Sequence, residues 1–274
     1  MPQTSYVLEK EIGYAGMKAN IRPDDIESFV AAEEIPLGSS VVKCKGTGLD
    51  TTIRLPIYDG VVITDDAGTF TAGTITATVH KNVVNGVDVP VTYSQVFGTD
   101  KDTSMAALAA KIAADAGVDT CVYSSSGHTM TLVGNADYSL TSVTVDVTGI
   151  TGAMTISSIA YSSSDKILGI AIHTHKDQES DGTVSYLVGE MVSVMRKGQA
   201  CIYVEEAVTS NDSVYARVYT ASATKNRGQF LKTSTAETVS AIHLYGKISL
   251  SAGWQFKKTL SGAGITTIEC NLPQ

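Results

Sequence analysis

The sequence predicts a mainly β protein that carries one inserted α+β domain, and three observations support this. Short runs of strand-forming residues alternate with turns rich in Gly, Ser and Asp along most of the chain. Convincing helical spacing of apolar residues occurs in one segment. The charge composition changes at both edges of residues 67–160. We therefore expect a discontinuous antiparallel β-barrel or sandwich domain, an inserted domain with one helix on an antiparallel sheet, and an N-terminal arm.

Residues 1–38 are predicted to form the arm, because their apolar groups are scattered among prolines and do not form a core-like pattern. Residues 24–32 have the spacing of a short helix, with Pro23 in its first turn. The side chains that this helix would bury are Ile26, Phe29 and Val30. Two roles stay open for the arm: it lies on a neighbouring subunit, or it adds a strand to the chain's own barrel.

The β-rich parent domain is predicted to consist of residues 39–66 and 161–274, because strand patterns recur there at regular spacing. The first two strands precede the insertion and the others follow it, so the parent domain is discontinuous. The predicted strands are residues 39–45, 51–57, 167–173, 184–194, 200–205, 213–219, 240–250 and 265–271.

The inserted domain is predicted at residues 67–160, which contain no Glu and no Arg. This span contains seven Asp and three Lys, which gives it a net charge of −4. Turn-forming stretches, TDDAG and YSSSD, mark its two edges. Because loop tips lose few backbone hydrogen bonds when they accept extra chain, we expect an insertion into a loop of the parent domain.

The insert itself is predicted to begin with a hairpin, since residues 74–83 and 87–95 flank the turn signal Asn85-Gly86. A helix follows, capped by Asp, Thr or Ser at 102–104 and ended by Gly117. Its apolar face is predicted to cover a sheet and consists of Met105, Leu108, Ala109, Ile112 and Ala116. Further strands are expected at residues 120–124, 128–133 and 142–148.

The formal charge of −8 argues against a nucleic-acid-binding protein, because an acidic surface repels phosphate. No apolar run has the roughly 18 residues that a membrane-spanning helix needs. The N-terminus lacks a basic start followed by an apolar core, so we expect no secretory signal and synthesis in the cytoplasm. The four cysteines are far apart and favour buried thiols, with a structural disulfide as the alternative; they are Cys44, Cys121, Cys201 and Cys270.

One cluster has metal-ligand spacing. His173 and His175 on a predicted strand, followed by Glu179, resemble the cupin pattern and could hold a transition metal. The match is partial, because the cupin glycine six residues before the first His is here Ile167, and no second His-containing motif follows. The segment KDQESDG is typical of a solvated turn, which we favour. We therefore predict no metal, no cofactor and no catalytic residue, and find none of the common catalytic motifs.

Five segments on the two sides of the insert share a pattern with a known family. They are AGM at 15–17, RPDDIESFVAAEEIPLG at 22–38, VSVMRKGQACIYVEEAVTSNDSVYARV at 192–218, GQF at 228–230 and CNLP at 270–273. Together they resemble the structural cement (head decoration) proteins of tailed bacteriophages. The resemblance implies a virion protein, not an enzyme, that binds the outside of the head, bridges neighbouring major capsid subunits and resists internal DNA pressure.

The implied partners are the major capsid protein and further copies of the chain, a homotrimer being favoured over a homodimer, with no nucleic acid and no membrane. Avidity from several weak contacts would supply the strength. The assembly residues that we expect, mostly from the arm, are Tyr6, Leu8, Ile12, Tyr14, Met17, Arg22 and Phe29.

Two other functions stay open. The insert could be a receptor- or glycan-binding module, since it contains the aromatic residues Phe70, Tyr93, Phe97, Tyr123 and Tyr138. We expect most of these rings to pack in the core instead, because they lie in predicted strands. A cupin-like metal-dependent enzyme at the His173 cluster is the less favoured second alternative.

Overall fold

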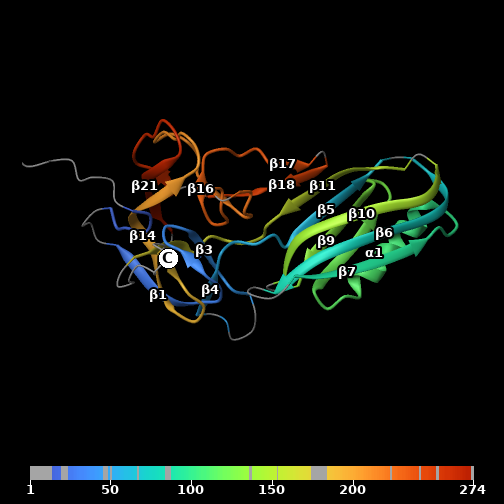
Figure 1. Ribbon diagram of the computed structural model, residues 1–274, viewed down its shortest axis with the longest axis horizontal. Coiled ribbons are helices and arrows are strands. Elements are labelled where there is room, and N and C mark those ends of the chain that lie inside the picture. Colours follow the sequence, from blue (N-terminus) through green and yellow to red (C-terminus); the bar gives the residue numbers. More distant parts are fainter. Residues whose placement is uncertain are drawn as a thin grey trace, which may run out of the picture.

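A computed structural model describes residues 14–19, 24–45, 49, 51–66, 68–83, 88–135, 138–152, 154–173, 184–222, 224–240, 242–250 and 253–272. The prediction of a mainly β protein with one helix is confirmed for these residues. Two lobes lie side by side along the long axis (Figure 1). We call them the barrel lobe, which contains the first strands of the chain, and the sandwich lobe, which contains the helix.

The barrel lobe takes its name from five strands, among the described residues, that close on themselves. In pairing order these strands are β1 (Asp25–Ala31), β4 (Thr52–Arg54), β3 (Ser40–Lys43), β12 (Gly169–Ile172) and β14 (Met191–Val204). β14 also pairs with β1, which completes the ring. Each strand contributes to one buried apolar cluster, which therefore fills the barrel; its members include Phe29, Val41, Ile53, Ala171 and Val192.

β1 corrects the helix that was predicted for residues 24–32. Residues 25–31 are a strand in the chain's own barrel, with Ser28 opposite Ser193 and Phe29 opposite Val192. The spacing of Ile26, Phe29 and Val30 suited a helix, but pairing along β14 satisfies the backbone and buries Phe29 inside the barrel. The strand alternative therefore holds for this part of the predicted arm.

β14 pairs in succession with two strands of the same ten-stranded sheet. Up to Lys197 it pairs with β1, and from Lys197 onward it pairs with the last strand, β21 (Gly264–Asn271). The change occurs beside Gly198, whose φ of 138° favours glycine and whose missing side chain leaves room for Asp24 and Met195. The sequence analysis had divided this strand into 184–194 and 200–205, whereas the structure shows one continuous strand.

The rest of the barrel lobe packs against the outside of the barrel. Four short strands extend the sheet of β14 and β21: β15 (Tyr215–Arg217), β16 (Phe230–Leu231), β19 (Lys247–Ser249) and β20 (Gln255–Phe256). Between them and the barrel lies a second core that includes Met195, Phe230, Trp254, Phe256 and Ile268. β2 (Ile35–Pro36) and β13 (Ser185–Tyr186) form a separate two-stranded pair.

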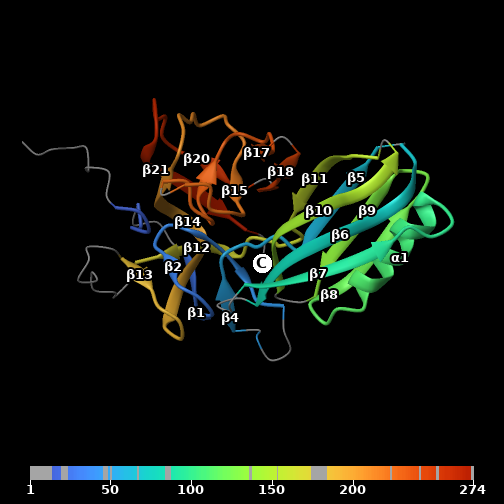
Figure 2. The same ribbon diagram turned by 45° about the vertical axis from the view of Figure 1, so that its right-hand side comes forward.

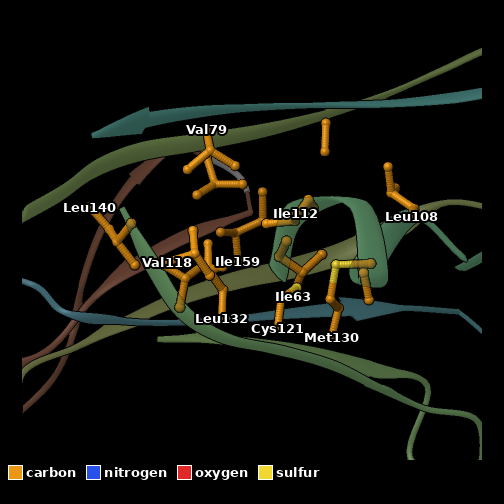
Figure 3. Close-up of a cluster of buried hydrophobic side chains, with 14 of the residues drawn as sticks. Ile63, Val79, Leu108, Ile112, Val118, Cys121, Met130, Leu132, Leu140 and Ile159 are labelled. Atoms are coloured by element: carbon orange, nitrogen blue, oxygen red, sulfur yellow. The ribbon is translucent and has the colours of Figure 1, made fainter. Parts of the chain in front are cut away.

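The sandwich lobe consists of two sheets and the helix (Figure 2). The larger sheet has the order β17 (Glu237–Ser240), β18 (His243–Tyr245), β11 (Ile156–Ser162), β5 (Gly60–Asp65), β9 (Thr129–Gly134) and β8 (Val118–Ser124). The smaller sheet has the order β10 (Tyr138–Gly152), β6 (Phe70–Val83) and β7 (Val89–Val96). Side chains of both sheets and the helix meet in one core, which Figure 3 shows for Ile63, Val79, Ile112 and Leu132.

The predicted helix is confirmed as α1 (Lys101–Ala113), but both of its ends differ from the prediction. Its N-cap is Asp100, whose side chain accepts a hydrogen bond from the Thr103 amide at 2.7 Å, so the cap precedes the predicted 102–104. The buried face matches the prediction at Met105, Leu108, Ala109 and Ile112, whereas Ala116 follows the helix and is exposed. α1 contacts β7 and β8, the edge strands of the two sheets, and so closes one side of the sandwich.

The sandwich lobe extends beyond the predicted insert of 67–160. β5 and β11 lie in the middle of its larger sheet, and β17 and β18 come from the C-terminal part of the chain. The predicted hairpin is present as the antiparallel pair β6–β7, while Asn85-Gly86 lies outside the described residues. The described part of the chain contains no helix that is long and apolar enough to cross a membrane.

Candidate functional site: the joint between the two lobes

Two of the chain segments that cross between the lobes, residues 55–59 and 163–168, are tied together by a buried ion pair. Arg54 at the end of β4 donates two hydrogen bonds to Asp165, at 2.7 Å to Oδ2 and 3.0 Å to Oδ1. The two side chains are 0% and 1% exposed. The Ile57 amide donates to the same carboxylate at 2.9 Å. Asp165 on the returning segment is thus bonded to both the side chain and the backbone of the outgoing segment, which fixes their separation.

A second charged group lies beside the first. Lys45 Nζ is 2.5 Å from Asp59 Oδ2 and 3.2 Å from Asp165 Oδ1. The Ser164 amide donates to Asp59 Oδ1 at 2.8 Å. Burial raises the pKa of Asp59, but the hydrogen bonds from Lys45 and Ser164 outweigh burial and lower this pKa overall. The carboxylate therefore stays charged and holds both crossing segments near neutral pH.

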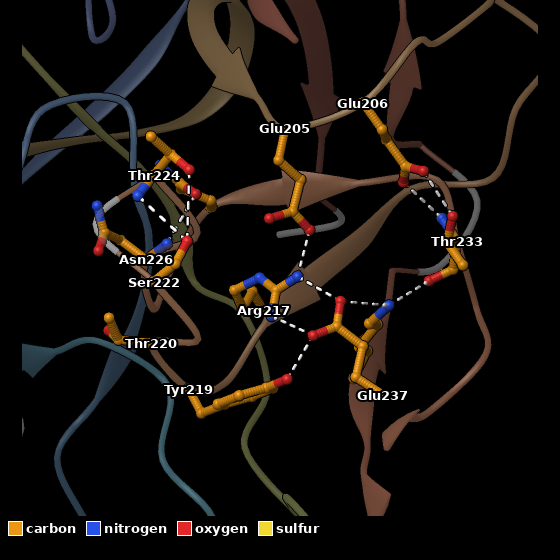
Figure 4. A network of polar contacts seen from close by, with 12 residues as sticks. Glu205, Glu206, Arg217, Tyr219, Thr220, Ser222, Thr224, Asn226, Thr233 and Glu237 are labelled. Atoms are coloured by element: carbon orange, nitrogen blue, oxygen red, sulfur yellow. Dashed lines mark hydrogen bonds and ion pairs between the residues drawn. The ribbon is translucent and has the colours of Figure 1, made fainter. Parts of the chain in front are cut away.

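A third contact joins β15 of the barrel lobe to β17 of the sandwich lobe (Figure 4). The fully buried Arg217 donates to Glu237 at 2.9 Å from Nη1 and 2.6 Å from Nη2, and also pairs with Glu205. Tyr219 donates to the same Glu237 carboxylate. The hydrogen bonds from Arg217 lower the pKa of Glu237 to about 2. A carboxylate of the sandwich lobe is thus bonded to a guanidinium inside the barrel lobe.

Four tyrosines fill the space next to these charges. The ring of Tyr245 stacks on Tyr161 at 4.6 Å between centroids and on Tyr219 at 4.5 Å. Tyr58 contacts all three rings, and its hydroxyl donates to the Gly246 carbonyl at 2.7 Å. Tyr219 follows β15, whereas the other three belong to the sandwich lobe. Aromatic stacking and buried hydrogen bonds therefore act together across the joint.

The three groups of contacts make the joint stiff. Separating the lobes would expose buried charges that are bonded to each other, and removing one partner from such a pair typically costs about 3–5 kcal/mol. No three His, Cys, Asp or Glu of the described residues are grouped to hold a metal ion.

The predicted metal cluster is only partly within the described residues. His173 follows β12, and its ring contacts Tyr14 edge to face at 5.4 Å between centroids. Its amide donates to the Gly16 carbonyl at 2.8 Å. His175 and Glu179 lie outside the described residues. The ring packing gives His173 a structural role, and metal binding by this segment stays an untested prediction.

The predicted assembly residues divide into three groups. Tyr6, Leu8, Ile12 and Arg22 lie outside the described residues. Tyr14 is 49% exposed and Met17 is half-buried, so both have surface for a partner. Phe29 is 5% exposed inside the barrel, which corrects its assignment to an exposed arm, because β1 points this ring inward.

The aromatic residues that suggested a glycan site mostly belong to the core. Phe70 is buried and packs edge to face on Phe97 at 5.2 Å. Tyr93 and Tyr123 pack against the sandwich core, and their hydroxyls bond to Asp115 and Asp65. Of these four rings Phe70 is buried, and the other three are partly buried against the core. The structure therefore gives no support to glycan binding by these residues.

Sequence reasoning missed the joint. Its partners are separated by 111 residues for Arg54 and Asp165 and by 20 for Arg217 and Glu237. A signal was present, because each arginine interrupts an otherwise apolar strand pattern, in TTIRLPI and in SVYARVY. A charged residue inside such a run is expected to be paired when buried. The identity of the partner needs the topology.

Comparison with protein-family models gives one match, described as structural cement protein (E217 gp24/Pam3 gp6), over residues 116–271. This span covers more than half of the chain. The chain belongs to the phage structural cement protein family. A search of curated proteins found no match.

Cement proteins are structural components of the phage particle that associate with the capsid and stabilise it. The family is not an enzyme family. In this chain the matched residues run from β8 to β21, so they include part of the sandwich lobe as well as Asp165, Arg217 and Glu237 of the joint. The family pattern therefore spans both lobes.

Proposed function

We propose that this chain decorates the outer surface of a tailed-phage head and bridges neighbouring major capsid subunits. The observation that carries the proposal is the stiff joint in a member of the cement family: Arg54–Asp165 and Arg217–Glu237 hold two lobes as one elongated body. A bridge between subunits resists separation only if it does not bend or stretch itself. A body with buried ionic and aromatic contacts at its narrowest part meets this requirement.

The strength of such a bridge would come from repetition. A single interface of standard size buries about 800 Å² on each partner and gives moderate affinity. An oligomer that contacts several capsid subunits gains avidity, because each further contact forms at a high effective concentration. We propose self-association for this reason, with a homotrimer favoured over a homodimer.

The N-terminal residues support the oligomer part of the proposal. Tyr6, Leu8 and Ile12 are apolar groups that precede the first described residue, and Tyr14 exposes half of its surface where the described chain begins. We propose that these residues, together with Met17 and Arg22, contact a neighbouring subunit. A segment that orders on a partner offsets its lost entropy with the apolar area that it buries there.

The net charge of the chain supports the proposed position on the outer surface of the head. Packaged DNA repels a chain with a net charge of −8, whereas the same charge carries no such penalty outside the space that the DNA fills. The proposed site of action is therefore the exterior of the shell, after synthesis in the cytoplasm of the host.

Phage particles that lack this chain provide the test. We expect them to lose DNA on heating or osmotic shock more readily than complete particles, and we expect purified chain to restore resistance when it is added from outside. The matched control is an equal amount of chain that was unfolded before addition. Equal resistance with and without the chain would contradict a cementing role.

A further inference from the structure

The turn that joins β13 to β14 has a fixed shape. Residues 187–190 form a β-turn in which the Glu190 amide donates to the Leu187 carbonyl at 3.1 Å. Gly189 occupies the third position with a φ of 83°, which a type II turn requires there. The turn is also bonded to β1, since the Gly189 amide donates to the Ala31 carbonyl at 2.8 Å and the Ala31 amide to the Glu190 carbonyl at 2.9 Å.

Three side chains on this turn are apolar and exposed, whereas Glu190 is partly buried and its Oε2 accepts a hydrogen bond from the Leu187 amide at 2.7 Å. Leu187 is 45% exposed, Val188 62% and Met191 58%. We call residues 187–191 the apolar turn. Turns at hairpin ends are normally built from Gly, Asn, Asp, Ser or Pro. The fold does not need Leu and Val here, because the backbone bonds and Gly189 define the turn without them. Exposed apolar side chains lower solubility, and where the fold does not require them they are typical of a binding surface.

The apolar surface continues along the barrel. Met191 lies opposite Val30 in the β1–β14 pair, so their side chains share the outward face. Ile26, on the same face of β1, is 38% exposed, and it is separated from Val30 by the exposed Ser28. In Figures 1 and 2 the β13–β14 connection projects beside β1 at the lower edge of the barrel lobe. The apolar turn is thus a convex tip with an apolar flank.

We infer that the apolar turn is the part of the barrel lobe that inserts into an apolar pocket on the outer face of the phage shell. This inference rests on the proposed function and identifies the docking surface for it. The backbone bonds to Ala31 preorganise the turn, so little entropy is lost on docking. Met191 has an unbranched, adaptable side chain that suits the irregular wall of such a pocket.

A second copy of the chain fits this surface less well. The three exposed apolar side chains of the turn would bury far less against another copy than the roughly 800 Å² per partner of a stable interface between subunits. A pocket in the shell can surround a convex tip on all sides, which is where apolar side chains contribute most to binding. The shell also repeats the pocket many times, which suits an oligomeric cement protein.

Two matched triple variants of the full chain test the inference. The turn variant combines Leu187→Asn, Val188→Thr and Met191→Gln, and the control variant combines Val89→Thr, Val96→Thr and Val122→Thr on the sandwich lobe. The control residues are 52%, 65% and 63% exposed, so the control variant shows whether polar substitutions at equally exposed apolar positions away from the turn affect binding. Both sets are exposed, so both variants should melt like the wild type. The single variant Val188→Thr is the fallback if the triple variant does not fold.

The measurement is the sedimentation of labelled chain with phage heads that lack it, together with the solution mass of each variant. We expect the turn variant to bind roughly 100-fold more weakly, Val188→Thr about 5-fold more weakly, and the control within about twofold of the wild type. Equal binding by wild type and turn variant would overturn the inference and leave the proposed function intact. Failure of the wild type to bind would overturn both. Loss of self-association with unchanged head binding would assign the turn to a second copy and overturn the inference.

Discussion

Arg54 and Asp165 form a bidentate ion pair with both side chains at most 1% exposed, at the place where the chain leaves the barrel lobe and returns to it. The outgoing and returning segments are therefore joined at the level of the joint and not only within each lobe. The ion pair therefore helps to fix the two lobes relative to each other, which the proposed bridging of capsid subunits requires.

Replacing Arg54 alone should destabilise the chain strongly. Arg54→Met leaves Asp165 buried with Lys45 as its remaining charged partner, and we expect the free energy of unfolding in urea to fall by about 3–5 kcal/mol. The double variant Arg54→Met with Asp165→Leu should recover most of this loss, because no buried charge is left without its partner. Lys197→Met, an exposed cation on β14, is the control. A loss below about 1 kcal/mol for the single variant would show that the pair does not hold the joint.

Protonation of Glu237 in acid should lower the free energy of unfolding of the chain. Its pKa is lowered from the ordinary 4.5 to about 2 by the hydrogen bonds from Arg217. Because the folded-state pKa is the lower one, its contribution is complete above the unfolded value and is lost as the pH falls toward about 2. The side chain is 26% exposed, so screening limits the effect to about 1–2 kcal/mol.

The measurement for Glu237 is the free energy of unfolding between neutral pH and about pH 2 for the wild type and Glu237→Gln. The variant should be less stable at neutral pH and should lose less stability on acidification. Asp119→Asn, at an exposed position on β8, is the matched control and should follow the wild type. Parallel pH curves for wild type and Glu237→Gln would contradict the role of this carboxylate.

The sandwich lobe should fold by itself when nearly all of its buried core residues are present. All buried members of its core except Val218 lie within residues 58–162, whereas a fragment of 68–160 lacks Tyr58, Val61, Ile63 and Tyr161. Removing β5 also separates β11 from β9 in the larger sheet. We expect fragment 58–162 to melt cooperatively and fragment 68–160 not to. Equal melts would place the boundary of the lobe where the sequence predicted it.

Two N-terminal deletions should have different effects. Removing residues 1–34 deletes β1, opens the barrel and removes Phe29 from its core, so we expect a much lower melting temperature. Removing residues 1–13 leaves every described barrel strand in place and should keep the melt while weakening self-association. Mass in solution and thermal melting separate the two effects. A large loss of stability from the shorter deletion would show that those residues belong to the core.

The elements that could be predicted from the sequence are those whose signal is local. The helix was found because Met105, Leu108 and Ile112 repeat at helical spacing, and the β6–β7 hairpin because two alternating runs flank a turn signal. The helix predicted around residues 26–30 was wrong, although it rested on the same kind of spacing that correctly predicted α1. Ile26, Phe29 and Val30 have helical spacing, but the free edge of β14 offered a strand partner, and sequence spacing alone does not contain that competition.

The joint could not be predicted, because its residues become neighbours only through the topology. Arg54 and Asp165 meet because the segment that leaves the barrel lobe after β4 lies beside the segment that returns to it before β12. Arg217 meets Glu237 because β17 joins a sheet made mostly of strands from far earlier in the chain. The sequence shows that each arginine interrupts an apolar run. It does not show which of the many carboxylates will lie within 3 Å.

The most direct test of the account is a three-dimensional reconstruction of the complete phage particle. We expect density of the two-lobed shape on the outside of the head, with each copy touching more than one major capsid subunit and the tip between β13 and β14 toward the shell. Density for this chain inside the head, in the tail, or nowhere on the particle would contradict the proposed function.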